Sequence, residues 1–145
     1  MGFEFREVIM YPDNLHYSPE HQWVRLEGDT ARIGITFFAQ HQMRDLVYFE
    51  LPKVGDKVRA GEPYGTMESV KAVSDINSPL TGEVIEVNET LEDAPRQVNQ
   101  DPYGAGWTIR IKLSDPSETN RLMDSTAYTK LAEETAAKRK PKVQE

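Results

Sequence analysis

The sequence predicts a mainly β fold, a small sandwich or barrel of short antiparallel strands that is closed by a C-terminal helix. Apolar and polar residues alternate along many short segments, which is typical of strands with one buried face. Gly, Pro and Asp recur between these segments, as expected of tight turns. After Ser114 the apolar residues adopt roughly helical spacing instead. Short strands at this spacing favour a sandwich or a barrel.

The first predicted element is a β-hairpin. Residues 23–27 and 31–35 alternate between apolar and polar side chains on either side of a Gly-Asp turn. Thr36 then has the position and the side chain of a helix N-cap, so a short helix is expected over 37–43.

The middle of the chain consists of short strands separated by turns. Residues 69–72 interrupt an apolar alternation, and a helical turn is expected within 89–98, broken near Pro95. Asp101-Pro102-Tyr103-Gly104 has the signature of a type I turn. Strands are predicted over residues 46–51, 64–68, 73–77 and 83–87.

The strongest alternation lies over 107–113 and predicts the last strand. Asp115 followed by Pro116, with an acid at Glu118, marks the start of a helix. Apolar residues continue at roughly helical spacing as far as Leu131. One C-terminal helix is therefore expected after Ser114.

The composition fits one domain of 145 residues, of which 38% are hydrophobic. We expect an N-terminal extension over 1–13, a domain over 14–131 that includes the C-terminal helix, and a charged helical or disordered tail over 132–145. The absence of cysteine excludes disulfides, cysteine nucleophiles and thiolate metal sites.

Charge and hydropathy argue against two classes of partner. The formal net charge is −7, and an acidic body repels phosphate backbones, so no nucleic-acid partner is expected. No apolar run approaches the length of a membrane span, and residues 1–10 do not resemble a secretory signal. We therefore expect no membrane partner and a cytoplasmic location, with a mature organellar form left open.

The sequence offers no self-contained catalytic site. His16, His21 and His41 stand in no metal-binding spacing, and no nucleophile is paired with a base, so no catalytic residue and no metal site are assigned. Lys71 is different, because it lies between two strand segments among small and apolar neighbours. A turn lysine is normally a charged, inert ammonium, and it gains a role only as a point of attachment.

The residues around Lys71 resemble the lipoyl-attachment motif of the glycine cleavage system H-protein family. The resemblance spans most of the chain, from about Leu15 to Leu131, with its blocks in the same order and at the same spacing. The blocks are Glu68-Ser69-Val70-Lys71-Ala72, Val54-Gly55-Asp56-Lys57-Val58, Gly61-Glu62, Ser78-Pro79, Gly82-Glu83-Val84, Val98-Asn99, Asp101-Pro102-Tyr103-Gly104 and Gly106-Trp107.

This resemblance implies a barrel-sandwich hybrid of the biotinyl/lipoyl-carrier type, with antiparallel strands, short helices and a C-terminal helix. It also implies that Lys71 carries lipoic acid in amide linkage, attached by a lipoate ligase or lipoyl transferase. The protein would then be a monomeric carrier and not an enzyme. Its lipoyl arm would shuttle the aminomethyl group and electrons between a pyridoxal-phosphate glycine decarboxylase, an aminomethyltransferase and a dihydrolipoyl dehydrogenase.

The resemblance implies two groups of site residues besides Lys71. One group surrounds the arm at its attachment point and is recognised by the attaching enzyme. The other lines a cleft that shields the loaded arm from water. The first group is Glu68, Ser69, Val70, Ala72 and Asp75; the second is Glu20, His21 and Gln22, with Asp75 near it.

Three departures from the family pattern keep an alternative open. Gln22 stands where the family has a glutamate that would pair with the charged amine of the loaded arm, and a neutral dipole binds such an amine more weakly. Residues 37–38 and Arg44 also depart from the pattern. The alternative is an H-like lipoate-binding protein that serves another pathway, such as sulfur-compound oxidation with a heterodisulfide-reductase-like complex.

Two further classes are weaker alternatives. Biotin carriers of the related fold usually flank the lysine with Met, whereas Val70 and Ala72 flank it here. A stand-alone hydrolase would keep its activity when Lys71 is replaced, whereas a carrier would lose all function.

Overall fold

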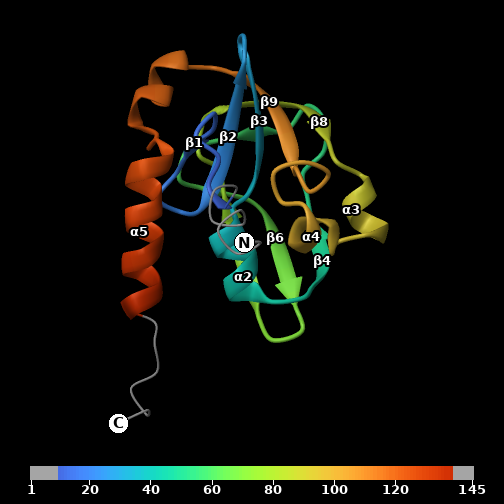
Figure 1. Cartoon of the computed structure of the whole chain (residues 1–145). Coiled ribbons are helices and arrows are strands. Elements are labelled where there is room, and N and C mark those ends of the chain that lie inside the picture. The colour runs from blue at the N-terminus through green and yellow to red at the C-terminus, as the bar shows by residue number, and fades with distance from the viewer. Residues whose placement is uncertain (1–9, 139–145) are drawn as a thin grey trace.

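Two antiparallel sheets form the body of the protein in the computed structural model, which describes residues 10–138 (Figure 1). The large sheet has the strand order β1-β2-β3-β9-β8-β5, and the small sheet has the order β4-β6-β7. Within that range the strands are β1 (His16–Tyr17), β2 (Gln22–Glu27), β3 (Thr30–Ile35), β4 (Leu46–Glu50), β5 (Lys57–Val58), β6 (Pro63–Ser69), β7 (Val73–Asn77), β8 (Gly82–Val87) and β9 (Ile109–Leu113). The predicted fold class is confirmed: mainly β, antiparallel and built from short strands.

The helices are short except for the last one. Thr36 caps α2 as predicted, because its hydroxyl accepts a hydrogen bond from the backbone N–H of Ala39. The helical turn expected within 89–98 is present as two short helices on either side of Pro95. The helices are α2 (Phe37–Met43), α3 (Thr90–Asp93), α4 (Gln97–Gln100), the 3-10 helix η1 (Pro116–Arg121) and α5 (Ser125–Lys138).

The predicted β2–β3 hairpin is present and continues into β9. Ala31 pairs with Ile111, and Ile33 pairs with Ile109, so the apolar residues of neighbouring strands share one face. These four side chains are fully buried. The period-two pattern in the sequence therefore marked the core face of the large sheet.

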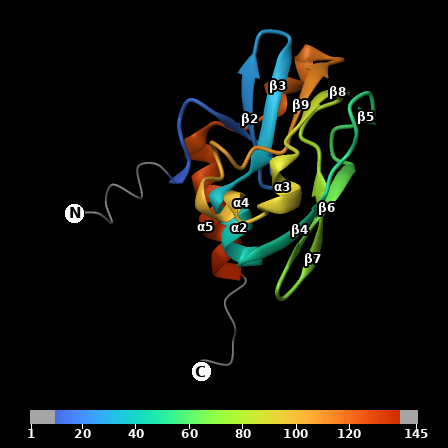
Figure 2. The ribbon, with the colours of Figure 1, turned by 90° about the vertical axis from the view of Figure 1, so that its right-hand side faces the viewer.

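The small sheet stands beside the large one, and its β6–β7 hairpin extends beyond the rest of the body (Figures 1 and 2). Glu68 pairs with Val73 and Met67 with Ser74, and Met67 also pairs with Phe49 of β4. Phe49 and Met67 are buried, so this row of the sheet faces the core. A second buried cluster lies under α5 and is formed by Leu15, Tyr17, Trp23, Phe38, Tyr128 and Ala132.

The C-terminal region differs from the single helix that the sequence predicted. Asp115 does cap a helix, but this is the 3-10 helix η1, and the backbone is extended again at Leu122. Met123 then forms a β-bridge with Tyr17, with backbone hydrogen bonds of 2.9 and 2.8 Å, before α5 begins. This pairing with the edge of β1 takes the backbone groups that a continuous helix would need.

The ends of the described region also pack on the body. The helix α5 passes position 131 without a break, and Ala132 beyond it is only 2% exposed. At the other end, the rings of Tyr11 and Tyr128 lie 5.2 Å apart.

Two further observations concern single elements. The strand expected over 107–113 begins at Ile109. No helix within residues 10–138 is long and apolar enough to cross a membrane.

Candidate functional site

Lys71 follows β6 and precedes β7, so it lies in the turn of this hairpin, whose two strands are labelled in Figure 2, and it is exposed to solvent. The backbone N–H of Ser69 donates to the carbonyl of Ala72 at 2.8 Å, so Val70 and Lys71 form the turn itself. We call residues 69–72 the apex. Lys71 forms no ion pair with any other residue in the described range, so its ammonium group is available to an approaching molecule.

The apex is held by a buried hydroxyl and by a neighbouring strand. The Oγ of Ser69 accepts hydrogen bonds from the N–H groups of Lys71 at 3.2 Å and Ala72 at 3.1 Å. The N–H of Val70 donates to the carbonyl of Asp45, just before β4, at 3.2 Å. The side chain of Ser69 is 6% exposed. The backbone beneath Lys71 therefore has a defined shape, while the residue itself is exposed to solvent.

The structure brings the predicted cleft residues together. Glu20, His21 and Gln22, from the turn before β2 and its first residue, line a small cavity of about 110 Å³ with Asp75 of β7. The sequence-based reasoning missed the other walls of this cavity. They are Phe38, Ala39, Gln42 and Met43 of α2, together with Met67 and Ser74 of the β6–β7 hairpin.

Helical spacing could show that α2 has a buried face, but it could not show which surface that face covers.

The residues around the apex do not line this cavity. They are Glu68, Val70, Lys71 and Ala72. Glu68 and Val70 are exposed, and Ala72 is half-buried. Lys71 and the cavity thus belong to the same hairpin, which contributes Met67, Ser74 and Asp75 to the cavity wall.

His21 connects the cavity to the C-terminal helix. Its Nδ1 lies 2.8 Å from the hydroxyl of Tyr128, and its ring packs 4.7 Å from the ring of Phe38. Its backbone is in the left-handed region, with φ 73°, which non-glycine residues adopt mainly in turns. His21 therefore shapes the turn that presents Glu20 and Gln22.

Gln22 does not face outward as a surface dipole, because it is only 2% exposed. Its Oε1 accepts a hydrogen bond from the hydroxyl of Tyr64 at 2.9 Å, and that hydroxyl lies 2.8 Å from the Oγ1 of Thr108. Burial raises the pKa of the Tyr64 phenol, which therefore stays protonated. The carboxamide is thus oriented by the protein interior, and the carboxylates near the cavity belong to the exposed residues Glu20 and Asp75.

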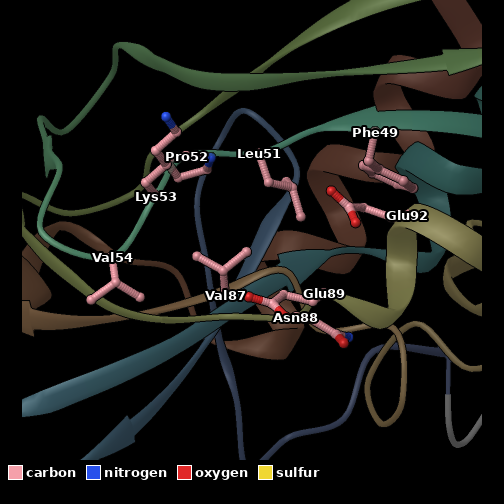
Figure 3. A pocket seen from close by; sticks show the side chains of 9 residues that line it. All are labelled: Phe49, Leu51, Pro52, Lys53, Val54, Val87, Asn88, Glu89 and Glu92. Carbon is pink, nitrogen blue, oxygen red and sulfur yellow. The ribbon is translucent and has the colours of Figure 1, made fainter.

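A larger groove, with a volume of about 500 Å³, lies elsewhere, between the end of β4 and the segment that joins β8 to α3. Figure 3 shows Leu51 and Val87 bordering the open space, with the carboxylate of Glu92 beside Phe49. The buried amide of Asn88 donates to the carbonyls of Ala105 and Trp107, so it is committed to holding a loop. No nucleophile is paired with a base among the residues that line this groove.

Metal-ligating side chains are also not clustered in the described part of the chain. No group of three or more His, Asp or Glu residues between positions 10 and 138 is placed to hold a metal ion. The chemical features that stand out are therefore an exposed amine on a rigid turn and a small cavity with two carboxylates beside it.

Comparison with known proteins gives one consistent result. The family described as "Glycine cleavage H-protein" matches residues 15–135. The glycine cleavage system H protein of Brevibacillus brevis is 51% identical over 124 residues, which cover 86% of this chain and 98% of that protein. Its counterpart in Anaeromyxobacter sp. is 51% identical over 123 residues, which cover 85% and 96%. The crystal structure of a glycine cleavage system H protein from Mycobacterium marinum superposes with a TM-score of 0.74 and 36% identity, covering 81% of this chain and 94% of that one.

Proposed function

The chain belongs to the glycine cleavage H-protein family, and we propose that it acts through a lipoyl group attached to Lys71. Membership makes the protein a carrier component of the glycine cleavage system, with the barrel-sandwich fold of its structural relative. The names of the relatives favour this function over a role in sulfur-compound oxidation. When bound, the lipoyl group supplies thiol–disulfide chemistry, which the side chains of a cysteine-free protein cannot supply.

The observation that carries the proposal is the exposed, unpaired amine of Lys71 on a hairpin apex held by Ser69. An attached acyl chain removes the positive charge of the amine and is displayed away from the body of the protein. Because the tether keeps the group local, its effective concentration near a docked enzyme is on the order of millimolar. The chain thus contributes position and access.

The small cavity beside the hairpin supports a second role, the protection of the loaded arm. Glu20 and Asp75 are the acidic residues among those that line it, and a carboxylate attracts a cationic amine. Its other walls include Phe38, Met43 and Met67, which are buried apolar side chains that exclude water. In this role Gln22 contributes a carboxamide that Tyr64 holds in place.

The proposed partners follow from the carrier function. A lipoate ligase or lipoyl transferase loads Lys71. The pyridoxal-phosphate glycine decarboxylase, the aminomethyltransferase and the dihydrolipoyl dehydrogenase then meet the arm in turn. Each of these partners needs Lys71 to be reachable, and the position of the apex at the end of the hairpin provides that access (Figure 2).

The test is modification followed by reconstitution. We expect the unmodified protein, treated with a lipoate ligase, lipoate and ATP, to gain the mass of one lipoyl group, and peptide mapping to place it on Lys71. Lys71→Arg should gain none, whereas Lys57→Arg, which changes another exposed lysine, should behave as the wild type. The loaded wild type should support glycine-dependent NADH formation with the three partner enzymes, and K71R should support none. Modification of another lysine, or activity of K71R, would contradict the proposal.

A further inference from the structure

Exposed apolar side chains gather around the apex. Among the described residues, four of the large hydrophobic side chains that are exposed belong to β4, the apex and the start of β7. They are Val47, Tyr48, Val70 and Val73, with exposed fractions of 47%, 53%, 71% and 68%. We call these four residues the apex patch. Scattered surface hydrophobics are ordinary, whereas a group of them on one face points to an interaction.

A β-bulge creates half of the apex patch. Leu46 pairs with Ser69, and Tyr48 pairs with Glu68. The pairing therefore advances by two residues in β4 but by only one in β6, and Val47 has no partner. In a regular strand, Val47 and Tyr48 would point to opposite faces, and one of them would be buried. The bulge leaves both exposed. Because the N–H of Val70 donates to the carbonyl of Asp45, this bulged segment runs directly beside the apex.

The same face of the small sheet is acidic. Tyr48, Glu68 and Val73 form one row across the three strands, and Glu50, Thr66 and Asp75 form the next row on the same face. The three strands contain three carboxylates, all exposed, and no basic residue. The neighbouring cations are Lys71 itself, Arg44 before β4, and Arg96, which lies 4.0 Å from Asp45. A partner surface that is apolar in its centre and basic around it would be complementary to this face.

We propose that the apex patch is the docking surface for the enzyme that attaches the lipoyl group to Lys71. This inference rests on the proposed function and identifies how one partner is bound. The enzyme meets a bare lysine, whose amine lies only four methylene groups from the backbone, so its active site must touch the hairpin itself. Enzymes that act on the finished arm meet a group at the far end of a longer chain and can remain further from the hairpin.

The reaction at the docked apex is an acyl transfer. The deprotonated Nζ of Lys71 attacks the carbonyl carbon of an activated acyl donor, such as an acyl adenylate, and forms the amide C–N bond. The bond from that carbon to the activating group breaks, and the activating group leaves with the electron pair. The amine loses one further proton to a base, so no oxidant or reductant is required.

The test compares two pairs of exposed apolar residues. The variant Val47→Thr/Tyr48→Ser alters the patch, and Val54→Thr/Ile85→Thr alters exposed side chains in other parts of the surface. We expect the kcat/KM of lipoate ligase, measured by intact mass over time, to fall about tenfold for the first variant, mainly through KM. The second variant should stay within about twofold of the wild type, since exposed positions away from the interface contribute little.

A charge variant tests the acidic face separately. Glu50→Gln/Asp75→Asn should slow lipoylation at low salt, and the difference from the wild type should shrink as salt is added. Circular dichroism melting curves check folding, and the single variants Val47→Thr and Tyr48→Ser replace the double variant if it fails to fold.

Each other outcome overturns the inference in a distinguishable way. A wild-type rate of lipoylation for the patch variants shows that the enzyme docks elsewhere. Normal lipoylation with slow glycine cleavage assigns the patch to a later enzyme, and self-association that Tyr48→Ser abolishes in sedimentation assigns it to a second copy. If the wild type itself gains no lipoyl group on Lys71, the proposed function fails, whatever the patch variants do.

Discussion

At the scale of single residues, Ser69 determines how Lys71 is presented. Its hydroxyl accepts the N–H groups of Lys71 and Ala72, which a hairpin turn would otherwise leave to solvent or to a strained backbone contact. Gln22 is held in a similar manner by the hydroxyl of Tyr64. In the first case a buried hydroxyl holds a backbone turn, and in the second it orients a side chain, so the removal of either hydroxyl should have a local effect.

We expect Ser69→Ala to lower the free energy of unfolding by about 1–2 kcal/mol, because two backbone donors lose their acceptor. Amide hydrogen exchange at Lys71 and Ala72 should become faster than in the wild type, and NMR measures this directly. Ser74→Ala is the control, since the hydroxyl of Ser74 donates to the carbonyl of Asp75 and does not contact the apex. Unchanged exchange at both amides would show that the hydroxyl does not hold the turn.

At the scale of elements, the small sheet depends on a close approach between β4 and β6. Gly65 of β6 lies so near the carbonyl of Glu50 that a Cβ atom would overlap it, and the Cα of Leu51 would be 3.6 Å away. The obstacle is backbone, which cannot rotate aside as a flexible side chain can. This pairing also positions the bulge at Val47, so the shape of the apex patch depends on it.

Gly65→Ala should therefore weaken the β4–β6 pairing and lower the free energy of unfolding by about 1–3 kcal/mol. Urea denaturation followed by circular dichroism measures the loss. Thr66→Ala changes the next residue of the same strand, where no such backbone contact is involved, and should cost less. Equal midpoints for Gly65→Ala and the wild type would show that the strands can separate without cost.

At the scale of the whole molecule, the two ends of the described chain meet in an aromatic cluster. Tyr17 donates to the carbonyl of Pro12, Tyr103 donates to the carbonyl of Met10, and the hydroxyl of Tyr128 lies 2.8 Å from Thr36 Oγ1. Burial, with a smaller contribution from Glu133, raises the pKa of Tyr11 to about 12. Burial also raises the pKa values of Tyr17, Tyr103 and Tyr128.

These shifts predict a loss of stability in alkaline solution. An unfolded tyrosine releases its proton near pH 10, whereas the folded protein still holds it, so the folded state binds more protons between about pH 10 and pH 12. The contribution of these phenols to the free energy of unfolding should be constant below about pH 10 and should fall as the pH rises further. Urea denaturation at a series of pH values measures the slope.

Tyr11→Phe provides the control for this pH dependence, because it removes one of the titrating phenols and keeps the ring contacts with Tyr17 and Tyr128. Its slope above pH 10 should be less steep than that of the wild type. A free energy of unfolding that does not change up to about pH 12 would contradict the assignment of these phenols to a buried cluster.

Local patterns predicted most of the fold. The β2–β3 hairpin and α2 with its Thr36 cap follow from period-two alternation and from capping chemistry, both of which act within a few residues. Lys71 was found by its motif, and its place at a hairpin end follows from the interruption between two strands. The break between η1 and α5 could not be found in this way, because Met123 pairs with Tyr17, which is distant in sequence.

Hydrophobic spacing and turn propensities are properties of neighbouring residues, so the order of the amino acids is enough to predict the strands, the turns and the lysine at the apex. The surroundings of that lysine depend on contacts between residues that are distant in the chain. The cavity joins residues 20–22, α2 and Asp75, the bulge exposes Val47 beside Tyr48, and Tyr64 orients Gln22. Such contacts depend on which buried surfaces pack together, and packing is settled over the whole chain at once.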